Sequence, residues 1–118
     1  MSTPFRISKH AAGDGVARLM VSGDLGRGTC DVLTAVIGNA LRETPVRELV
    51  VDLRHVGFLD AMGVRALLAG SETAAEHGAG WRVAGVWDMP RRVLEISGLI
   101  QQLNVSPADH PLDAAPVS

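Results

Sequence analysis

Two short loops hold the residues of this chain that could do chemistry. The first is GDLGRG, residues 23–28, and the second is FLDAMG, residues 58–63. Each loop contributes one carboxylate, Asp24 and Asp60, and a pair of carboxylates can act as general acid and general base. Neither loop adds a histidine, a tyrosine or an obvious nucleophile. The two acids are therefore better explained as a helix cap and a solvated charge than as a catalytic pair.

The loop at residues 23–28 has the composition of a phosphate-binding loop but not its spacing. Its glycines follow G-x-x-G-x-G, whereas dinucleotide-binding loops use G-x-G-x-x-G. It is also not followed by the lysine and Ser/Thr pair of a P-loop. We interpret these glycines as parts of a tight turn between a strand and a helix.

Metal and redox chemistry find little support in the sequence. Cys30 is the only cysteine, so no disulfide can form within the chain, and we interpret it as a small apolar residue near a helix start. The histidines are scattered, without the spacing of a zinc site: His10, His55, His77 and His110. We therefore predict no metal, no cofactor and no enzymatic activity.

The composition limits the partners and the location of the protein. Its 118 residues include 11 basic and 13 acidic side chains, and the formal net charge of −2 argues against a nucleic-acid partner. With two Trp, two Phe and no Tyr, a platform for stacking bases is not expected. No apolar run approaches the roughly 18 residues of a membrane span, and the first ten residues lack the apolar core of a signal peptide. These features predict a cytoplasmic protein without membrane insertion.

Hydrophobic periodicity predicts the elements that position the first loop. Alternating side chains predict strands over residues 5–8 and 16–25, joined by a hairpin turn at Asp14-Gly15. A helix begins at Thr29 and ends before Pro45, because the residue before a proline avoids helical backbone.

The elements around the second loop continue the alternation. The apolar run 48–53 predicts a central strand covered on both faces. A helix follows the loop, with a left-handed cap at Gly78 or Gly80. Its predicted apolar stripe is Val64, Leu67, Leu68 and Ala75.

The last third of the chain adds a strand over residues 81–86 and a helix over residues 89–99, with Pro90 in its first turn. Residues 101–105 are predicted to form a final edge strand. The whole order predicts an α/β domain with a mostly parallel central sheet, an N-terminal antiparallel hairpin and helices packed against the sheet. We assign residues 1–105 to this single domain and expect residues 106–118, which contain three prolines, to be a disordered tail.

The turn DAMG places a thioether near the start of a helix. Asp60 can cap this helix by accepting hydrogen bonds from its first free N–H groups. Met62 should lie in the first turn and near the surface, because the apolar stripe is already formed by other residues. Methionine fills irregular gaps in cores and also suits adaptable contact surfaces. The contact role is slightly favoured for Met62, and the core role stays open.

Four sequence blocks, in this order, resemble those of a STAS domain: GDL, ELVVDLRHVGFLDAMGVRALL, GAGWRVAGV and VLEISGLIQQL. The chain is similar, more closely, to bacterial anti-sigma factor antagonists, and the likeness covers residues 5–105. This resemblance implies a domain that is not an enzyme. It implies instead that the domain binds an anti-sigma factor, usually an ATPase-type serine kinase, and thereby frees a sigma factor.

The resemblance also locates a regulatory position. In that family the kinase phosphorylates a Ser or Thr within D-S-S-G or D-S-T-G, and the added charge of roughly −1.5 to −2 weakens the complex. Asp60 and Gly63 match this frame, whereas Ala61 and Met62 replace its two hydroxyl residues. Gly26 stands where members often have an acid. The resemblance thus implies a domain that keeps its binding role and is not phosphorylated at the usual site.

The leading hypothesis is a docking face formed by the two loops and the turn before the last helix. Trp87 is either the anchor of this face or a rim residue that covers the sheet. The residues predicted to contact the partner are Asp24, Arg27, Asp60, Ala61, Met62, Gly63, Arg65, Trp87 and Met89. One alternative is a STAS subunit of another assembly, such as a lipid-transport complex or a stress-sensing particle. Another is a small-ligand sensor that uses the two loops. The sequence leaves open whether the chain forms a homodimer.

Overall fold

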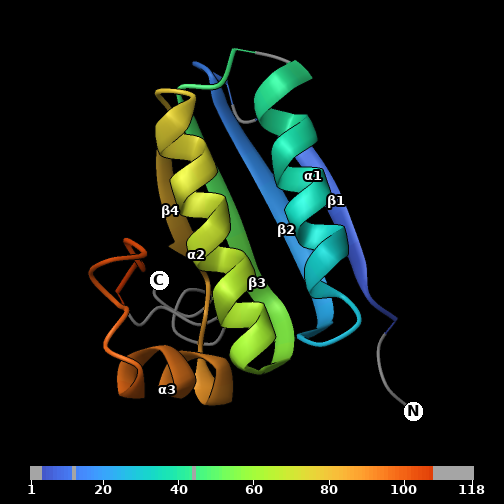
Figure 1. The fold of residues 1–118 in the computed structure, drawn as a ribbon, viewed down its shortest axis with the longest axis vertical. Coiled ribbons are helices and arrows are strands. Elements are labelled where there is room, and N and C mark those ends of the chain that lie inside the picture. The colour runs from blue at the N-terminus through green and yellow to red at the C-terminus, as the bar shows by residue number, and fades with distance from the viewer. Residues whose placement is uncertain (1–3, 12, 44, 108–118) are drawn as a thin grey trace, which may run out of the picture.

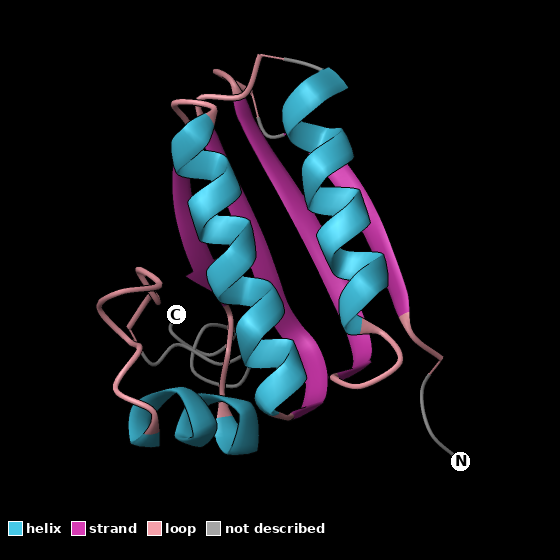
Figure 2. Ribbon diagram, in the orientation of Figure 1, coloured by secondary structure: helices cyan, strands magenta, loops and turns pink. Residues whose placement is uncertain are grey.

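The computed structural model describes residues 4–11, 13–43 and 45–107 (Figure 1). Strands and helices alternate along the chain after the opening hairpin, as predicted (Figure 2). In order they are β1 (Arg6–Ala11), β2 (Val16–Leu25), α1 (Cys30–Glu43), β3 (Glu48–Leu59), α2 (Ala61–Glu76), β4 (Gly80–Ala84) and α3 (Asp88–Ile96).

The four strands form one sheet in the order β1-β2-β3-β4. β1 pairs with β2 in antiparallel fashion, whereas β2, β3 and β4 run parallel. The hairpin turn has left-handed backbone at Asp14 (φ 53°) and Gly15 (φ 80°), the conformation that a tight hairpin requires. The predicted α/β domain, with a mostly parallel sheet and an N-terminal antiparallel hairpin, is confirmed.

The helices divide the molecule into layers. α1 and α2 lie side by side on one face of the sheet, and α3 lies at the end of the molecule where α2 begins (Figure 1). The core fills the space between this helix pair and the sheet. Fully buried side chains from the sheet and from both helices meet there, among them Leu19, Val21, Leu33, Ile37, Leu53 and Leu67.

β3 is the central strand, and its residues 49–53 are each at most 1% exposed. The predicted burial on both faces is therefore present, but it has different causes on the two faces. α1 and α2 cover one face, whereas Asp52 on the other face is buried beneath arginine side chains. Asp52 Oδ2 accepts a hydrogen bond from Arg18 Nη1 at 2.6 Å, and Arg54 Nη2 lies 3.8 Å from the same oxygen.

The structure corrects the prediction at the end of α2. Ala74 is buried and Ala75 is exposed, because Ala74 follows Leu67 by two helical turns and so lies on the same side of the helix. The left-handed glycine after the helix is Gly78 (φ 73°), which directly follows the C-cap residue His77.

The predicted edge strand over residues 101–105 is also wrong. This segment forms turns, and its backbone pairs with the sheet through one parallel bridge between Val83 and Val105. The side chain of Asn104 also donates to the Trp81 carbonyl of β4 at 2.8 Å. Asn104 has left-handed backbone (φ 52°), which is incompatible with an extended strand. Leu103 is fully buried, so the segment still closes the core.

The domain continues to the end of the described chain. The N–H of Ser106 donates to the Val83 carbonyl, and its own carbonyl accepts a hydrogen bond from Arg91 Nη1. Residues 108–118, most of the predicted tail, lie outside the described residues. None of the described helices combines the length and the apolar character that a membrane span requires.

Candidate functional site at the start of α2

Asp60 is the N-cap residue of α2. Its backbone is extended, and its Oδ1 accepts hydrogen bonds from the N–H groups of Met62 at 2.9 Å and Gly63 at 3.0 Å. These are two of the N–H groups that a helix start leaves without a partner in the helix itself. The predicted capping role of Asp60 is confirmed.

The second oxygen of Asp60 joins the two loops. Oδ2 accepts a hydrogen bond from the N–H of Arg27 at 3.1 Å, so the loop after β2 is tied to the start of α2. The hydrogen bond from Gly63 is the largest cause that lowers the pKa of the Asp60 carboxyl, followed by the bond from Arg27. The bond from Met62 and the charge of Arg27 lower this pKa further, against an opposing effect of burial. Because three backbone bonds hold the carboxylate, Asp60 serves as a structural anion rather than as a base.

Two glycines allow the loops to approach this closely. A Cβ on Gly26 would lie 2.5 Å from Cγ of Asp60. A Cβ on Gly63 would overlap the carbonyl oxygen of Leu25 and lie 2.7 Å from Cδ1 of Leu59. At position 26 an acidic side chain would therefore meet a carboxylate that already fills the space.

Thr29 closes the first loop in a way that the sequence analysis missed. Its hydroxyl donates to the Asp24 carbonyl at 2.8 Å and accepts from the N–H of Gly26 at 2.9 Å. The available signal was a threonine at the predicted start of the helix, because threonine is typical of capping positions. Thr29 and Asp60 together fix the backbone of both loops.

Met62 lies on the surface, and its side chain is 41% exposed. The core role left open for Met62 is therefore excluded. One shallow hollow beside it is lined by Arg27, Asp60, Ala61 and Met62. A second hollow, between α1 and α2, is lined by Cys30, Asp31, Thr34, Met62, Arg65, Ala66 and Ala69.

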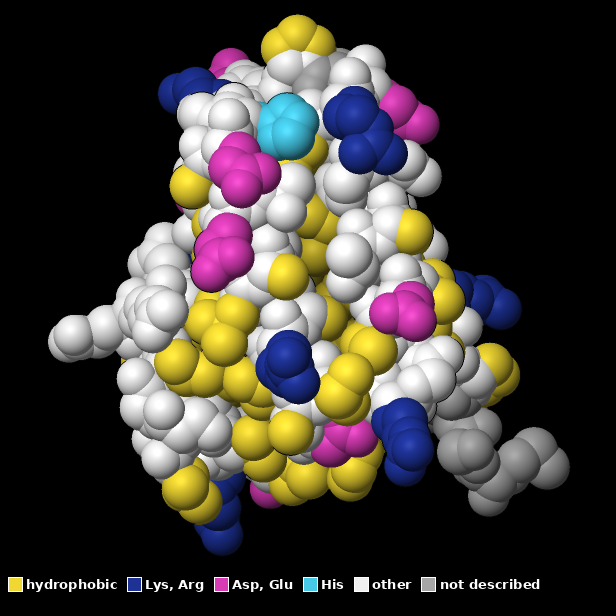
Figure 3. Space-filling view, in the orientation of Figure 1, with side chains coloured by type: hydrophobic (Ala, Val, Ile, Leu, Met, Phe, Trp, Pro, Cys, Tyr) yellow, Lys and Arg dark blue, Asp and Glu magenta, His cyan; other side chains and the backbone are white. Residues whose placement is uncertain are grey.

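The helix-covered side of the molecule has an uneven distribution of side chains. Hydrophobic groups gather over the half that contains the start of α2, with acidic and basic groups among them, and a histidine lies over the other half (Figure 3). Val32 in the first turn of α1 is 47% exposed, and Ile96 at the end of α3 is 80% exposed. An apolar surface of this kind is typical of contact sites.

The structure brings together most of the residues predicted to contact a partner. Arg27, Asp60, Ala61, Met62 and Arg65 line the two hollows at the start of α2. The buried Gly63 contributes only its backbone to this site.

The remaining three predicted residues, Asp24, Trp87 and Met89, do not line these two hollows. Asp24 is exposed at the end of β2, and Met89 is 37% exposed in the first turn of α3. Trp87 lies on the face of the sheet away from α1 and α2, which we call the open face. Its Nε1 donates to the Arg54 carbonyl at 3.0 Å, so the predicted anchor points away from the surface around Met62.

No group of three or more His, Cys, Asp or Glu that could hold a metal ion occurs among residues 4–11, 13–43 and 45–107. The geometry at the start of α2 thus consists of a capped helix entrance, an exposed thioether and two flanking arginines. Such a surface can bind a partner.

Replacing Asp60 with alanine is expected to destabilise the protein in a pH-dependent way. Folding lowers the pKa of Asp60, so its contribution is fully present above the unfolded pKa and is lost as the pH falls through the lower folded pKa. The urea midpoint of Asp60→Ala should therefore lie below that of the wild type at pH 7, and the difference should shrink below about pH 4. Asp60→Asn, which keeps an acceptor oxygen, should lie between them at pH 7 and match the wild type in acid. A difference that does not change with pH would contradict this account.

The sequence model of a family described as "Mlab, STAS domain" matches residues 9–105. The chain belongs to the STAS domain family. The matched residues include the whole of β2 to α3 and both loops of the candidate site.

Solved structures resemble this STAS domain over most of its length. An anti-sigma factor antagonist from Mycobacterium paratuberculosis is 28% identical, with a TM-score of 0.79 and a coverage of 92% of each chain. A sulfate transporter family protein from Wolinella succinogenes is also 28% identical, with a TM-score of 0.70 and a coverage of 89% of this chain and 85% of that one. The anti-sigma factor antagonist SpoIIAA in its unphosphorylated form is 16% identical, with a TM-score of 0.72 and a coverage of 92% and 95%, which supports the fold alone.

Proposed function

We propose that this STAS domain is an anti-sigma factor antagonist that acts by binding alone. It binds an anti-sigma factor of the ATPase-type serine kinase class and thereby makes a sigma factor available. The observation that carries the proposal is the exposed, apolar start of α2, in which Met62 replaces the family's phosphoacceptor. The proposal is also supported by the similarity to an anti-sigma factor antagonist, which extends over 92% of each of the two chains.

The chemistry of the surface suits a protein partner. Met62 offers a flexible apolar side chain that adapts to an opposing surface. Arg27 and Arg65 flank it and can pair with carboxylates at the rim of an interface. The apolar side chains of α1 and α3 extend the contact area beyond the turn.

The absence of a hydroxyl at position 62 makes the proposed complex insensitive to the partner's kinase activity. Ala61 and Met62 together leave no hydroxyl in the turn from Asp60 to Gly63. Binding should therefore be the same with and without ATP and magnesium, under conditions in which the kinase phosphorylates a competent substrate.

The test is the affinity for the anti-sigma factors of the source organism, measured by calorimetry. Met62→Asp should weaken the complex by about tenfold or more, because an unpaired carboxylate would be buried in an apolar contact. The matched control is Ala75→Asp, which adds the same charge to an exposed position of α2, about 20 Å away along the helix. Unchanged binding by Met62→Asp would contradict the proposed face, and a screen without any binding anti-sigma factor would contradict the proposed function.

A second function is favoured by the similarity to the sulfate transporter family protein, which reaches the same identity of 28%. In that case the domain is a STAS subunit of a transporter or another assembly. Neighbouring genes for a sigma factor and an ATPase-type kinase favour the first function, and genes for transporter subunits favour the second.

A further inference from the structure

The open face of the sheet is polar where the helix-covered face is apolar. Along β2 the half-buried Arg18, Met20 and Ser22 alternate with the fully buried Leu19 and Val21. Side chains on neighbouring strands that are paired in register point to the same face. The register therefore places Arg6, His10, Asp52 and Arg82 on the open face as well.

The charge on this face has the opposite sign to that of the whole chain. Among the residues that the structure describes, four guanidinium groups, those of Arg6, Arg18, Arg54 and Arg82, share the face with two carboxylates, those of Glu48 and Asp52. The chain as a whole has a formal net charge of −2. The open face is thus the basic side of an acidic protein and favours an anionic occupant.

Arg54 has hydrogen-bond donors to spare at this face. The Asp52 carboxylate is already engaged, by Arg18 at Oδ2 and by the N–H of Arg54 at Oδ1, 2.9 Å away. The guanidinium of Arg54 reaches Oδ2 only at 3.8 Å, which is too long for a hydrogen bond. Among the described residues, Nε of Arg54 has no hydrogen-bond partner. The guanidinium can therefore turn its donors to another acceptor without breaking an existing hydrogen bond.

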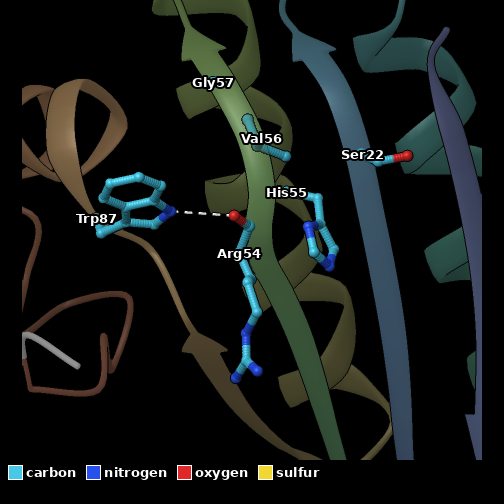
Figure 4. A pocket seen from close by; sticks show the side chains of 6 residues that line it. All are labelled: Ser22, Arg54, His55, Val56, Gly57 and Trp87. Carbon is cyan, nitrogen blue, oxygen red and sulfur yellow. Dashed lines mark hydrogen bonds between the residues drawn. The ribbon is translucent and has the colours of Figure 1, made fainter. Parts of the chain in front are cut away.

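A pocket of about 530 Å³ lies beside Arg54 and is lined by Ser22, Arg54, His55, Val56, Gly57 and Trp87. Its side chains come from β2, β3 and the segment before α3, and the helix pair lies on the other side of the sheet (Figure 4). The hydrogen bond from Trp87 Nε1 to the Arg54 carbonyl fixes the indole beside β3. Ser22, His55 and Arg54 are the polar residues of the lining, and the indole supplies a flat apolar wall. In the conformation drawn in Figure 4 the Arg54 side chain extends along β3, away from the indole. This combination of an apolar wall with a few polar groups is typical of small-molecule sites.

We propose that this pocket binds a small molecule that carries an oxyanion next to a planar apolar group. The oxyanion pairs with the guanidinium of Arg54, which forms charge-assisted hydrogen bonds with phosphate or carboxylate oxygens. The planar group packs against the indole of Trp87. The site lies on the opposite side of the sheet from Met62, so ligand binding and partner docking use separate surfaces.

Titration with phenyl phosphate, followed by two-dimensional NMR of the full chain, tests the proposal. Saturable shifts should appear for the Trp87 indole N–H and for the amides of residues 54–57. Inorganic phosphate should bind more weakly at the same residues, because it lacks the planar group. Phenol should give no saturable shift, because it lacks the oxyanion. Arg54→Gln should weaken phenyl phosphate binding by about tenfold or more. The matched control Arg82→Gln removes the same charge from the same face but outside the pocket, and it should bind as the wild type does.

A second variant keeps the proposal testable if Arg54→Gln does not fold. Gly57 lines the pocket, and a Cβ on it has no atom within 4 Å, so Gly57→Leu adds bulk at the pocket without a backbone clash and leaves every charge in place. It should abolish the shifts while its own spectrum stays dispersed. Wild-type binding by Gly57→Leu, an equal loss in Arg54→Gln and Arg82→Gln, or no saturable shift in the wild type would overturn the proposal. Binding that appears only after removal of residues 108–118, which contain Asp109 and Asp113, would assign the pocket to this acidic segment and overturn it as well.

Discussion

Replacing Gly63 with alanine is expected to lower the free energy of unfolding by about 1 to 3 kcal/mol. The added Cβ would overlap the Leu25 carbonyl oxygen, and it would lie 2.7 Å from Cδ1 of Leu59. The carbonyl belongs to the backbone of β2, so the contact is relieved only if the start of α2 moves away from the sheet. That movement would also weaken the hydrogen bond between Gly63 and Asp60. Urea unfolding, followed by circular dichroism, measures the effect.

Gly38→Ala is the matched control, because it makes the same substitution inside a helix where there is more space. A Cβ on Gly38 would meet only the flexible end of Arg42, with Nη1 at 3.2 Å. Alanine should stabilise α1 at this position by roughly 0.5 to 1 kcal/mol, since glycine is a poor helix former. The two variants should thus change stability in opposite directions. Equal stability of Gly63→Ala and the wild type would show that α2 does not need the close approach to Leu25.

The order of the elements was predictable because each has a strong local pattern. Alternating side chains in residues 16–25 predict β2 with the bounds that the structure has. Apolar spacing and Pro45 predict α1 to within a residue at each end. The edge strand predicted for residues 101–105 was wrong because a short segment with only two apolar residues is equally compatible with a turn that buries Leu103.

The central strand shows where a local pattern misleads. The apolar run 48–53 predicts a strand covered on both faces, and the burial of its side chains agrees with this prediction. The run contains Asp52, however, and a buried carboxylate needs a partner. That partner, Arg18, is 34 residues away in the sequence. Only the pairing of β2 with β3 brings the two together, so the sequence did not reveal the salt bridge or the open face that it occupies.

In the candidate site, too, contacts between residues close in sequence were predictable and contacts between distant residues were not. The cap formed by Asp60 follows from residues two and three positions later, and it was predicted. The contact of Asp60 with Arg27 joins residues that are 33 positions apart, and the sequence did not predict it. Its residue type and its place in the turn before the last helix favour a docking role for Trp87. Its hydrogen bond to the Arg54 carbonyl instead orients it toward the open face. Contacts distant in sequence thus decide which of the predicted residues share a surface.

Replacing Met62 with serine is expected to restore phosphorylation by the anti-sigma kinase that binds the wild type. Position 62 is exposed and lies in the first turn of α2, where a kinase can reach a hydroxyl. A phosphoserine there would be flanked by Arg27 and Arg65, and it would lie at a helix N-terminus, which favours an anion by about 0.3 to 1 kcal/mol. Intact-mass spectrometry after incubation with kinase and ATP should show one phosphoryl group on Met62→Ser and none on the wild type.

Met62→Ala is the control that removes the thioether without supplying a hydroxyl, and it should stay unmodified. The hydroxyls of Ser71 and Thr73 already donate to carbonyls within α2, at 2.8 and 3.0 Å. Kinase-dependent phosphorylation of Ser71 or Thr73 in the wild type would contradict the proposal that phosphorylation does not regulate this domain.

The phosphorylated variant also tests whether position 62 lies in the interface. Its phosphate would add a charge of roughly −1.5 to −2 next to the Asp60 carboxylate, whose Oδ1 already occupies the first N–H groups of the helix. The excess negative charge would have to be desolvated on binding, so phosphorylated Met62→Ser should bind the anti-sigma factor more weakly than its unmodified form. The wild type should bind equally with and without ATP. If phosphorylated and unmodified Met62→Ser bind equally well, the partner contacts another surface of the domain, and the proposed docking face is wrong.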